Sequence, residues 1–86
     1  MDEYTIHFLS SAAREFRSLP ANVKSRVAEA VDRLGQNPGP GGVRKLVGHD
    51  QLYRIRVGQY RVVYQIDDDM RIVRVTRIRH RRDAYR

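Results

Sequence analysis

A glycine- and proline-rich segment divides this chain into two halves that differ in hydrophobic periodicity. Residues 35–42 read Gly-Gln-Asn-Pro-Gly-Pro-Gly-Gly, a composition too rich in Gly and Pro for regular structure, so we expect a loop there. Most of the preceding half carries apolar residues at helical spacing, whereas the following half carries runs that alternate with the period of a strand. The two halves together predict an α+β fold.

The first half predicts a strand followed by a short helix. Residues 4–9 alternate apolar and polar side chains as far as Phe8, which is typical of a strand. Ser10 and Ser11 are candidate N-caps for a helix over residues 12–19. Pro20 stops this helix, because a proline lacks the backbone N–H that a helix interior needs.

A second helix is predicted over residues 21–34, with Pro20 in its first turn. Its apolar residues recur at helical spacing and make it amphipathic; they are Val23, Val27, Ala30, Val31 and Leu34. Gly35 and the Asn37-Pro38 pair are expected to end it. The two helices then form a helical hairpin.

The second half predicts a three-stranded antiparallel meander. Its strand-like runs are Leu52–Val57, Tyr60–Ile66 and Met70–Arg79. Gly58-Gln59 has the form of a two-residue hairpin turn, and Asp67–Asp69 forms a second turn. We expect the meander and the first strand to form one sheet with both helices on one face. A chain of 86 residues has room for a single domain, residues 1–86.

The predicted hairpin brings three arginines together. If Gly58-Gln59 is the turn, the opposing pairs are Val57 with Tyr60, Arg56 with Arg61, Ile55 with Val62, and Arg54 with Val63. Because side chains alternate, Arg54, Arg56 and Arg61 share the face that the helices leave free. Like charges directly opposite each other cost about 0.2–1 kcal/mol. Such a face favours an anion between the guanidinium groups, although a solvated face with arginines paired to nearby acids is the alternative.

The net positive charge lies entirely in the second half. Residues 1–43 carry five basic and five acidic side chains, whereas residues 44–86 carry twelve basic and five acidic ones, which accounts for the net charge of +7. A dense arginine surface suits a phosphate-rich partner or an acidic protein. The arginines of the last run cannot all share one face, so they are not assigned individually; they are Arg71, Arg74, Arg77 and Arg79.

Composition excludes several other classes of function. There are no cysteines, which removes disulfides and thiolate chemistry and indicates a cytoplasmic protein. No signal peptide is expected, and no run approaches the roughly 18 apolar residues of a membrane span. His7, His49 and His80 are scattered and Asp67–Asp69 has turn chemistry, so we expect no metal site and no small-molecule cofactor.

The last ten residues combine an imidazole, several guanidinium groups and a phenol. They read Arg77-Ile78-Arg79-His80-Arg81-Arg82-Asp83-Ala84-Tyr85-Arg86. Cleavage of RNA by its own 2′-hydroxyl needs a group that removes a proton, cations that stabilise the phosphate, and a group that protonates the leaving oxygen. Neutral imidazole titrates in the right range and guanidinium groups match phosphate oxygens. The tail therefore holds the parts of a metal-free ribonuclease.

Three blocks of this sequence resemble the RelE/ParE superfamily of toxins from toxin–antitoxin pairs. The blocks are Leu52-Tyr53-Arg54-Ile55-Arg56-Val57-Gly58, Tyr60-Arg61-Val62-Val63-Tyr64 and His80-Arg81-Arg82-Asp83-Ala84-Tyr85-Arg86. The order strand, helix, helix, three strands is similar over essentially the whole chain, as is the break at Leu19-Pro20. The resemblance implies a type II toxin of the RelE kind, an endoribonuclease that cuts messenger RNA in the ribosomal A site.

The resemblance also implies roles for individual residues. The positions that match the family's catalytic set are Arg54, Arg56, Arg61, His80, Arg81 and Tyr85, and further RNA contacts are expected from Arg44, Lys45, Arg82 and Arg86. Arg61 matches a phosphate-contacting arginine, Arg81 one that acts on the transition state or leaving group, and Tyr85 a tyrosine near the 2′-hydroxyl. Arginine cannot replace a lysine base at positions 54 or 56, because guanidinium stays protonated. The base would be Tyr85 or His80.

A toxin of this kind implies a partner that neutralises it. The resemblance predicts a RelB-like antitoxin with acidic residues, and the ribosome and messenger RNA as targets. Two alternatives remain open: a ParE-like poison of DNA gyrase, or a relative that binds antitoxin without activity. A plain RNA- or DNA-binding module has weaker support, since the sequence contains neither a recognition helix nor an aromatic platform.

Overall fold

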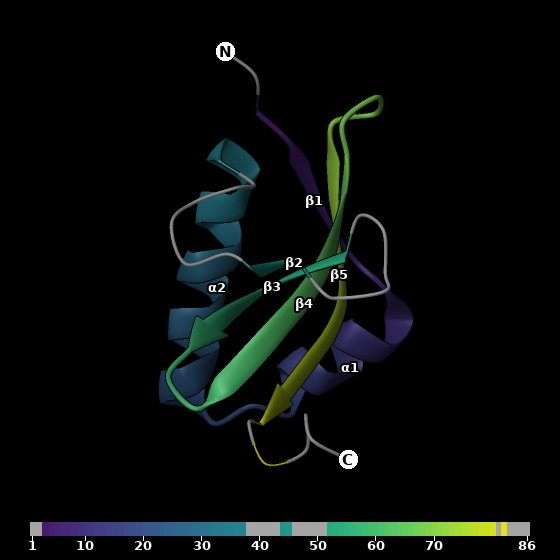
Figure 1. Cartoon of the computed structure of the whole chain (residues 1–86). Coiled ribbons are helices and arrows are strands. Elements are labelled where there is room, and N and C mark those ends of the chain that lie inside the picture. The colour runs from purple at the N-terminus through teal and green to yellow at the C-terminus, as the bar shows by residue number, and fades with distance from the viewer. Residues whose placement is uncertain (1–2, 38–43, 46–51, 81, 83–86) are drawn as a thin grey trace.

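The computed structural model describes residues 3–37, 44–45, 52–80 and 82 (Figure 1). Its elements in chain order are β1 (Thr5–Phe8), α1 (Ser10–Arg17), α2 (Ala21–Gln36), β2 (Arg44–Lys45), β3 (Leu52–Val57), β4 (Tyr60–Asp67) and β5 (Ile72–His80). The α+β fold and the order strand, two helices, three strands are confirmed. β2 was not predicted: it is a two-residue strand at the edge of the sheet.

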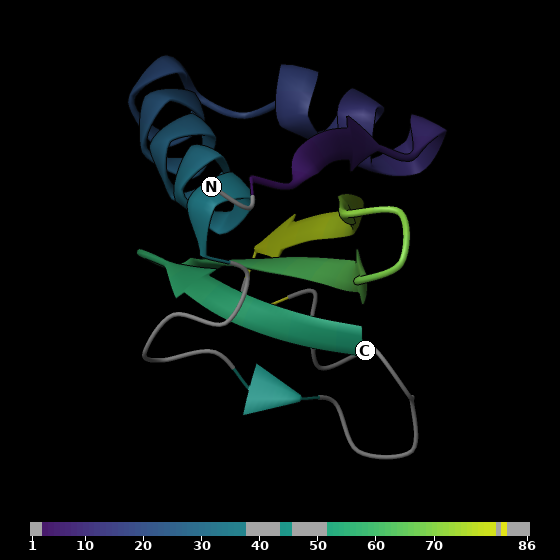
Figure 2. The same ribbon diagram turned by 90° about the horizontal axis from the view of Figure 1, so that it is seen from above.

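The sheet has five strands in the order β1-β5-β4-β3-β2. β1 runs parallel to β5, and the other neighbours are antiparallel. Both helices lie on the same side of the strands, with β2 farthest from them (Figure 2). The first strand therefore pairs with the last, and the two helices between them cover one face of the sheet.

α1 begins two residues earlier than predicted, and neither predicted serine cap is correct. The residue before the helix is Leu9, and no side chain caps the first turn. Ser10 and Ser11 lie inside the helix instead. The Ser11 hydroxyl donates a hydrogen bond to the backbone oxygen of Thr76 at 3.3 Å, so this serine joins α1 to β5 rather than capping a helix end.

α2 continues to Gln36, beyond the glycine that was expected to end it. Gly35 is buried inside the helix, and its backbone oxygen accepts a hydrogen bond from the Tyr4 N–H at 2.7 Å. A Cβ at this position would lie 3.1 Å from the Tyr4 oxygen. The glycine therefore permits β1 to approach the helix closely. No helix in the described part of the chain is long and apolar enough to cross a bilayer.

The hydrophobic core fills the space between the helices and the covered sheet face. Its buried residues are Ala12, Val27, Val31, Leu34, Val57, Val62, Tyr64, Val73, Val75 and Ile78. Phe8 and Phe16 extend the core between β1 and α1, with ring centroids 5.5 Å apart. Burying this apolar face holds the sheet in one register, because a slip by one residue would expose it.

The β3–β4 hairpin has the register that the sequence predicted. Val57 lies opposite Tyr60 and Arg56 opposite Arg61, with the two-residue turn at Gly58-Gln59. Gly58 has a φ of 59°, a left-handed conformation that glycine adopts without steric cost. The turn and the end of β5 lie at the same end of the molecule (Figure 1).

Candidate nucleic-acid interface

Three arginines of the β3–β4 hairpin lie on the sheet face that the helices leave uncovered. Arg56 lies opposite Arg61, and Arg54 lies opposite Val63. Tyr53, paired with Tyr64, belongs to the covered face, where the two rings stack with centroids 5.9 Å apart. Arg54, Arg56 and Arg61 therefore share the uncovered face, as the hairpin register predicted.

β5 contributes two more arginines to this face because it contains an irregularity. The pairing of β4 with β5 shifts between Val63, opposite Arg77, and Tyr64, opposite Val75. Thr76 is thus an extra residue in β5, and its hydroxyl donates to the Val63 oxygen at 3.2 Å. Such a bulge changes which side chains face which way. It places Arg77, opposite Val63, and Arg79, opposite Arg61, on the uncovered face, the side on which Arg74 already lies before the bulge, opposite Gln65.

Three arginines form a row across three neighbouring strands. Arg56 lies opposite Arg61, and Arg61 lies opposite Arg79. Arg61, in the middle, is 9% exposed and is the one buried charged side chain among the residues that the structure describes. We define the arginine face as Arg54, Arg56, Arg61, Arg77 and Arg79. Adjacent like charges of this kind are unfavourable without an anion near them.

Only part of the arginine face is neutralised within the described chain. Glu15 Oε2 on α1 lies 3.3 Å from Nε of Arg79 and 3.5 Å from Nη1 of Arg77. Arg54 and Arg56 form no ion pair with any residue in the described ranges. The β3 side of the face therefore offers guanidinium groups to an external anion.

The acidic residues of the second half that the structure describes, Asp67, Asp68 and Asp69, gather at the other end of β4. Asp67 binds Arg74 at 3.4 Å and accepts a hydrogen bond from the Met70 N–H at 3.0 Å. The Met70 N–H, and then Arg74, hold the pKa of the Asp67 carboxyl below its ordinary value, against an opposing effect of burial. Asp68 accepts a hydrogen bond from the Tyr4 hydroxyl. Among the described residues of the sheet, the carboxylates thus lie at the β4–β5 turn and the arginine row lies near the β3–β4 turn.

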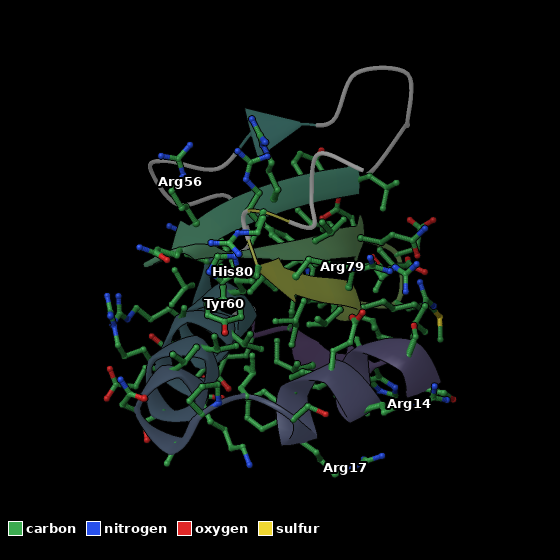
Figure 3. The ribbon with its side chains drawn as sticks, turned by 90° about the horizontal axis from the view of Figure 1, so that it is seen from below. Arg14, Arg17, Arg56, Tyr60, Arg79 and His80 are labelled. Atoms are coloured by element: carbon green, nitrogen blue, oxygen red, sulfur yellow. The ribbon has the colours of Figure 1, made fainter. Side chains whose placement is uncertain are left out.

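His80 is the last residue of β5, rather than part of a tail that follows it as the sequence predicted. It lies opposite Tyr60, so its side chain is on the covered side, not in the arginine row. The two rings meet edge to face, with centroids 5.0 Å apart and planes at 84°, and Figure 3 shows them next to each other.

The hydrogen bonds of His80 define one tautomer. Nδ1 accepts from the Arg82 backbone N–H at 3.1 Å, and Nε2 lies 3.2 Å from Oε1 of Gln59. A nitrogen that accepts a hydrogen bond carries no proton, so this arrangement fits a neutral imidazole that donates from Nε2. A depression of about 350 Å³ between α1 and the end of β5 lies beside the ring and is lined by Arg14, Glu15, Ser18, Leu19, Tyr60, Ile78, Arg79 and His80.

Comparison with known proteins identifies the family. A family profile described as "ParE toxin of type II toxin-antitoxin system, parDE" matches residues 4–85. The chain is 36% identical over 87 residues to Toxin RelG of Mycobacterium tuberculosis, covering 96% of this chain and 97% of that protein. This chain belongs to the RelE/ParE toxins of type II toxin–antitoxin systems. Putative toxin RelE1 of Methanocaldococcus jannaschii is 28% identical over 87 residues, covering 98% of this chain and 97% of that protein.

Solved structures of RelE/ParE toxins have the same fold. A chain of the archaeal RelE–RelB complex from Pyrococcus horikoshii OT3 matches with a TM-score of 0.81 and 29% identity, covering 94% of this chain and 97% of that chain. The isolated RelE toxin of E. coli matches with a TM-score of 0.81 and 26% identity, covering 90% of this chain and 83% of that chain. The resemblance of the three sequence blocks to this superfamily is confirmed.

Several residues assigned to the toxin's site fall outside what the structure describes. Arg81, Tyr85 and Arg86 lie outside the described residues, so the roles implied for them stay predictions. Arg44 and Lys45 form β2, where the Arg44 backbone lies opposite Arg54. Arg82 is exposed, and its backbone N–H binds His80. Within the described ranges, no three His, Asp or Glu side chains are grouped to hold a metal ion.

Sequence reasoning missed Arg77 and Arg79 as parts of the toxin's arginine face, and Glu15 as the residue that pairs with both. One signal was present: the core residues of β5 are spaced by two and then three positions, a pattern that indicates an extra residue in a strand; they are Val73, Val75 and Ile78. Glu15 had no comparable signal, because its contacts join α1 to a strand more than sixty residues away in the chain.

Proposed function

We propose that this toxin is a ribosome-dependent endoribonuclease that cleaves messenger RNA in the A site through the 2′-hydroxyl. The row of Arg56, Arg61 and Arg79 carries the proposal, because it aligns guanidinium groups from three strands as an extended anionic chain requires. RNA phosphates would relieve the repulsion within this row. A tyrosine ring is also able to stack on an unpaired base, and Tyr85 is the proposed residue for this contact.

The proposed chemistry needs proton transfer as well as phosphate binding. None of the five residues of the arginine face is able to act as a base, because guanidinium stays protonated. Tyr85 or His80 would remove the 2′-hydroxyl proton, and Arg81 would act on the leaving group. In this role His80 would accept the proton at Nδ1, after that nitrogen has released the Arg82 backbone N–H that it binds in the free toxin. The proposed reaction uses no metal ion and no organic cofactor.

We propose a RelB-like antitoxin as the partner that keeps the toxin inactive in the cell. The support is the archaeal RelE–RelB complex, of which one chain matches this fold. A segment of the antitoxin with acidic residues would cover the arginine face, since Arg54 and Arg56 have no ion pair within the described chain. The proposed place of action is the cytoplasm, where ribosomes and messenger RNA are found.

Programmed 70S ribosomes test the proposed activity. Purified toxin is incubated with them, and messenger RNA ends are mapped by primer extension. We expect cuts within the A-site codon that Arg61→Ala abolishes and that the exposed variant Arg56→Ala weakens without a burden on the fold. Arg17→Ala is the matched control, because Arg17 is exposed on α1 and points away from the strands (Figure 3). Intact messenger RNA with the wild-type toxin would contradict the proposal.

The second candidate function is a ParE-like poison of DNA gyrase. It is favoured by the matching family profile, which is described for ParE toxins. The two activities differ in what stops first when cells express the toxin. Protein synthesis is measured by the incorporation of radiolabelled methionine, and its loss supports the ribonuclease. Loss of DNA synthesis together with cleaved gyrase–DNA complexes supports the gyrase poison.

A further inference from the structure

α1 closes an edge of β5 that no strand covers in the described chain. β1 pairs with β5 only from Ile72 to Val75. Beyond that point α1 continues along the same edge, where Ser11 binds the Thr76 oxygen. Glu15 Oε1 then accepts a hydrogen bond from the Ile78 N–H at 2.8 Å. Side chains of the helix thus bind the backbone groups that another strand would otherwise bind.

The same Glu15 carboxylate reaches the arginine face with its second oxygen. Oε2 lies 3.5 Å from Nη1 of Arg77 and 3.3 Å from Nε of Arg79. The Glu15 side chain is 24% exposed, so these contacts are less screened by solvent than a pair on the open surface. One oxygen therefore fixes the strand edge, and the other fixes two guanidinium groups.

This contact divides the arginine face into a restrained part and an open part. Arg77 and Arg79 are held by Glu15, whereas Arg56 has no ion pair in the described residues. The ion pair uses Nε of Arg79 and leaves its Nη groups out of that contact, so the guanidinium keeps donors that suit a phosphate. A negative charge here lowers the affinity of the face for phosphate while it limits the orientations of Arg79.

We propose that Glu15 is a positioning residue for RNA cleavage. It holds Arg79 in line with Arg61 and Arg56 at the geometry that the reacting phosphate needs, at the expense of affinity for RNA in general. This inference rests on the proposed function, since it assumes that the arginine face binds the cleaved strand. A contact that weakens the binding of RNA but holds Arg79 in the orientation that the transition state needs raises the rate of the chemical step rather than the affinity.

The test compares Glu15→Gln with Glu29→Gln. A glutamine at position 15 still accepts the Ile78 N–H but no longer holds the two arginines by charge. Glu29 is the matched control, because it also pairs with an arginine, Arg33 at 3.7 Å, but is 72% exposed on α2. Each variant is measured for affinity to a single-stranded RNA oligonucleotide with a 2′-deoxy cleavage site, and for its single-turnover cleavage rate on programmed ribosomes. Thermal unfolding verifies that both variants are folded.

For Glu15→Gln we expect tighter binding together with slower cleavage. One additional phosphate contact steepens the slope of log affinity against log salt by about 0.7, which corresponds to about fivefold tighter binding at 0.1 M salt. We expect the saturating cleavage rate to fall by about tenfold or more, because the orientation of Arg79 is lost. Glu29→Gln should match the wild type in both measurements.

Other outcomes overturn the inference in distinguishable ways. Weaker binding and slower cleavage together would mean that Glu15 only supports the fold, and an unchanged rate would mean that it does not position Arg79. If the wild-type toxin itself fails to cut the message, the proposed function is wrong and the cleavage role of Glu15 is lost with it. The oligonucleotide measurement still decides in that case whether Glu15 restrains the face.

Discussion

Arg61 and Arg79 lie directly opposite each other on neighbouring strands, although both carry a positive charge. Arg61 faces Arg56 in the same way on its other side. Glu15 offsets part of this repulsion by holding Arg79, yet no ion pair within the described chain holds Arg56. A fold selected for stability alone would not need this row, so the row supports a function in anion binding.

Arg56→Gln should stabilise the toxin while it weakens RNA binding. Arg56 is exposed and opposite Arg61, so its removal relieves repulsion worth about 0.2–1 kcal/mol in the free energy of unfolding. Urea unfolding measures this gain, and Arg17→Gln serves as the control because Arg17 lies away from the strands. A loss of stability in Arg56→Gln would show that the row is not strained by its own charge.

The affinity of the toxin for single-stranded RNA should depend steeply on salt. Glu15 neutralises one charge of the arginine face, so the five guanidinium groups of the face together neutralise about four phosphates, and log affinity falls with log salt at a slope of about −2.8. Replacing any one of them by glutamine should reduce this slope by about 0.7. Fluorescence anisotropy between low and physiological salt measures it. An affinity that does not change with salt would be incompatible with RNA binding at this face.

The hairpin could be predicted from sequence because a two-residue turn leaves only one register. Gly58-Gln59 sets Val57 opposite Tyr60, and every later pair follows from alternation. The same reasoning failed for β5, where Thr76 adds a residue that alternation does not anticipate. Three arginines of the face were therefore found from sequence, and the two on β5 required the structure.

The remaining differences arise from contacts between distant parts of the chain. Glycine is common at the end of a helix, yet Gly35 lies inside α2, where β1 approaches it closely. Serine is a preferred N-cap residue of helices, yet the Ser11 hydroxyl binds the backbone of β5. β2 has two residues and no hydrophobic periodicity, so pairing with β3 alone defines it. Local sequence preferences were overridden in each case by tertiary packing.

Gly58→Ala should destabilise the toxin through the backbone rather than through packing. The φ of Gly58 is 59°, where a residue with a Cβ costs about 1–2 kcal/mol. The added Cβ would itself lie 3.5 Å from the nearest atom, Nη1 of Arg26, which is ordinary contact. Gly58→Asn should cost less, since asparagine adopts this conformation more readily. Equal losses of unfolding free energy in the two variants would contradict a backbone cause.

Tyr64 should make the toxin less stable as the pH rises above 10. Burial, with a smaller contribution from neighbouring Tyr53, raises the pKa of Tyr64 above its ordinary value of 10.0. Above that pH the unfolded chain releases the phenolic proton while the folded chain retains it, so unfolding becomes more favourable as pH rises. The contribution is fully present below pH 10, and its slope approaches about 1.4 kcal/mol per pH unit above it.

Urea unfolding of the wild type and of Tyr64→Phe between pH 8 and about 11 isolates this contribution. The substitution also removes the hydroxyl itself, and the packing change that this causes adds an effect on stability that is the same at every pH. The informative quantity is therefore the slope of the unfolding free energy against pH. In Tyr64→Phe this slope should be shallower by up to about 1.4 kcal/mol per pH unit, the value for one proton, since the other titrating groups are common to both proteins. Identical slopes would show that the Tyr64 phenol ionises alike in the folded and unfolded chains, and its burial against Val62 and Val75 would then not exclude the charged form.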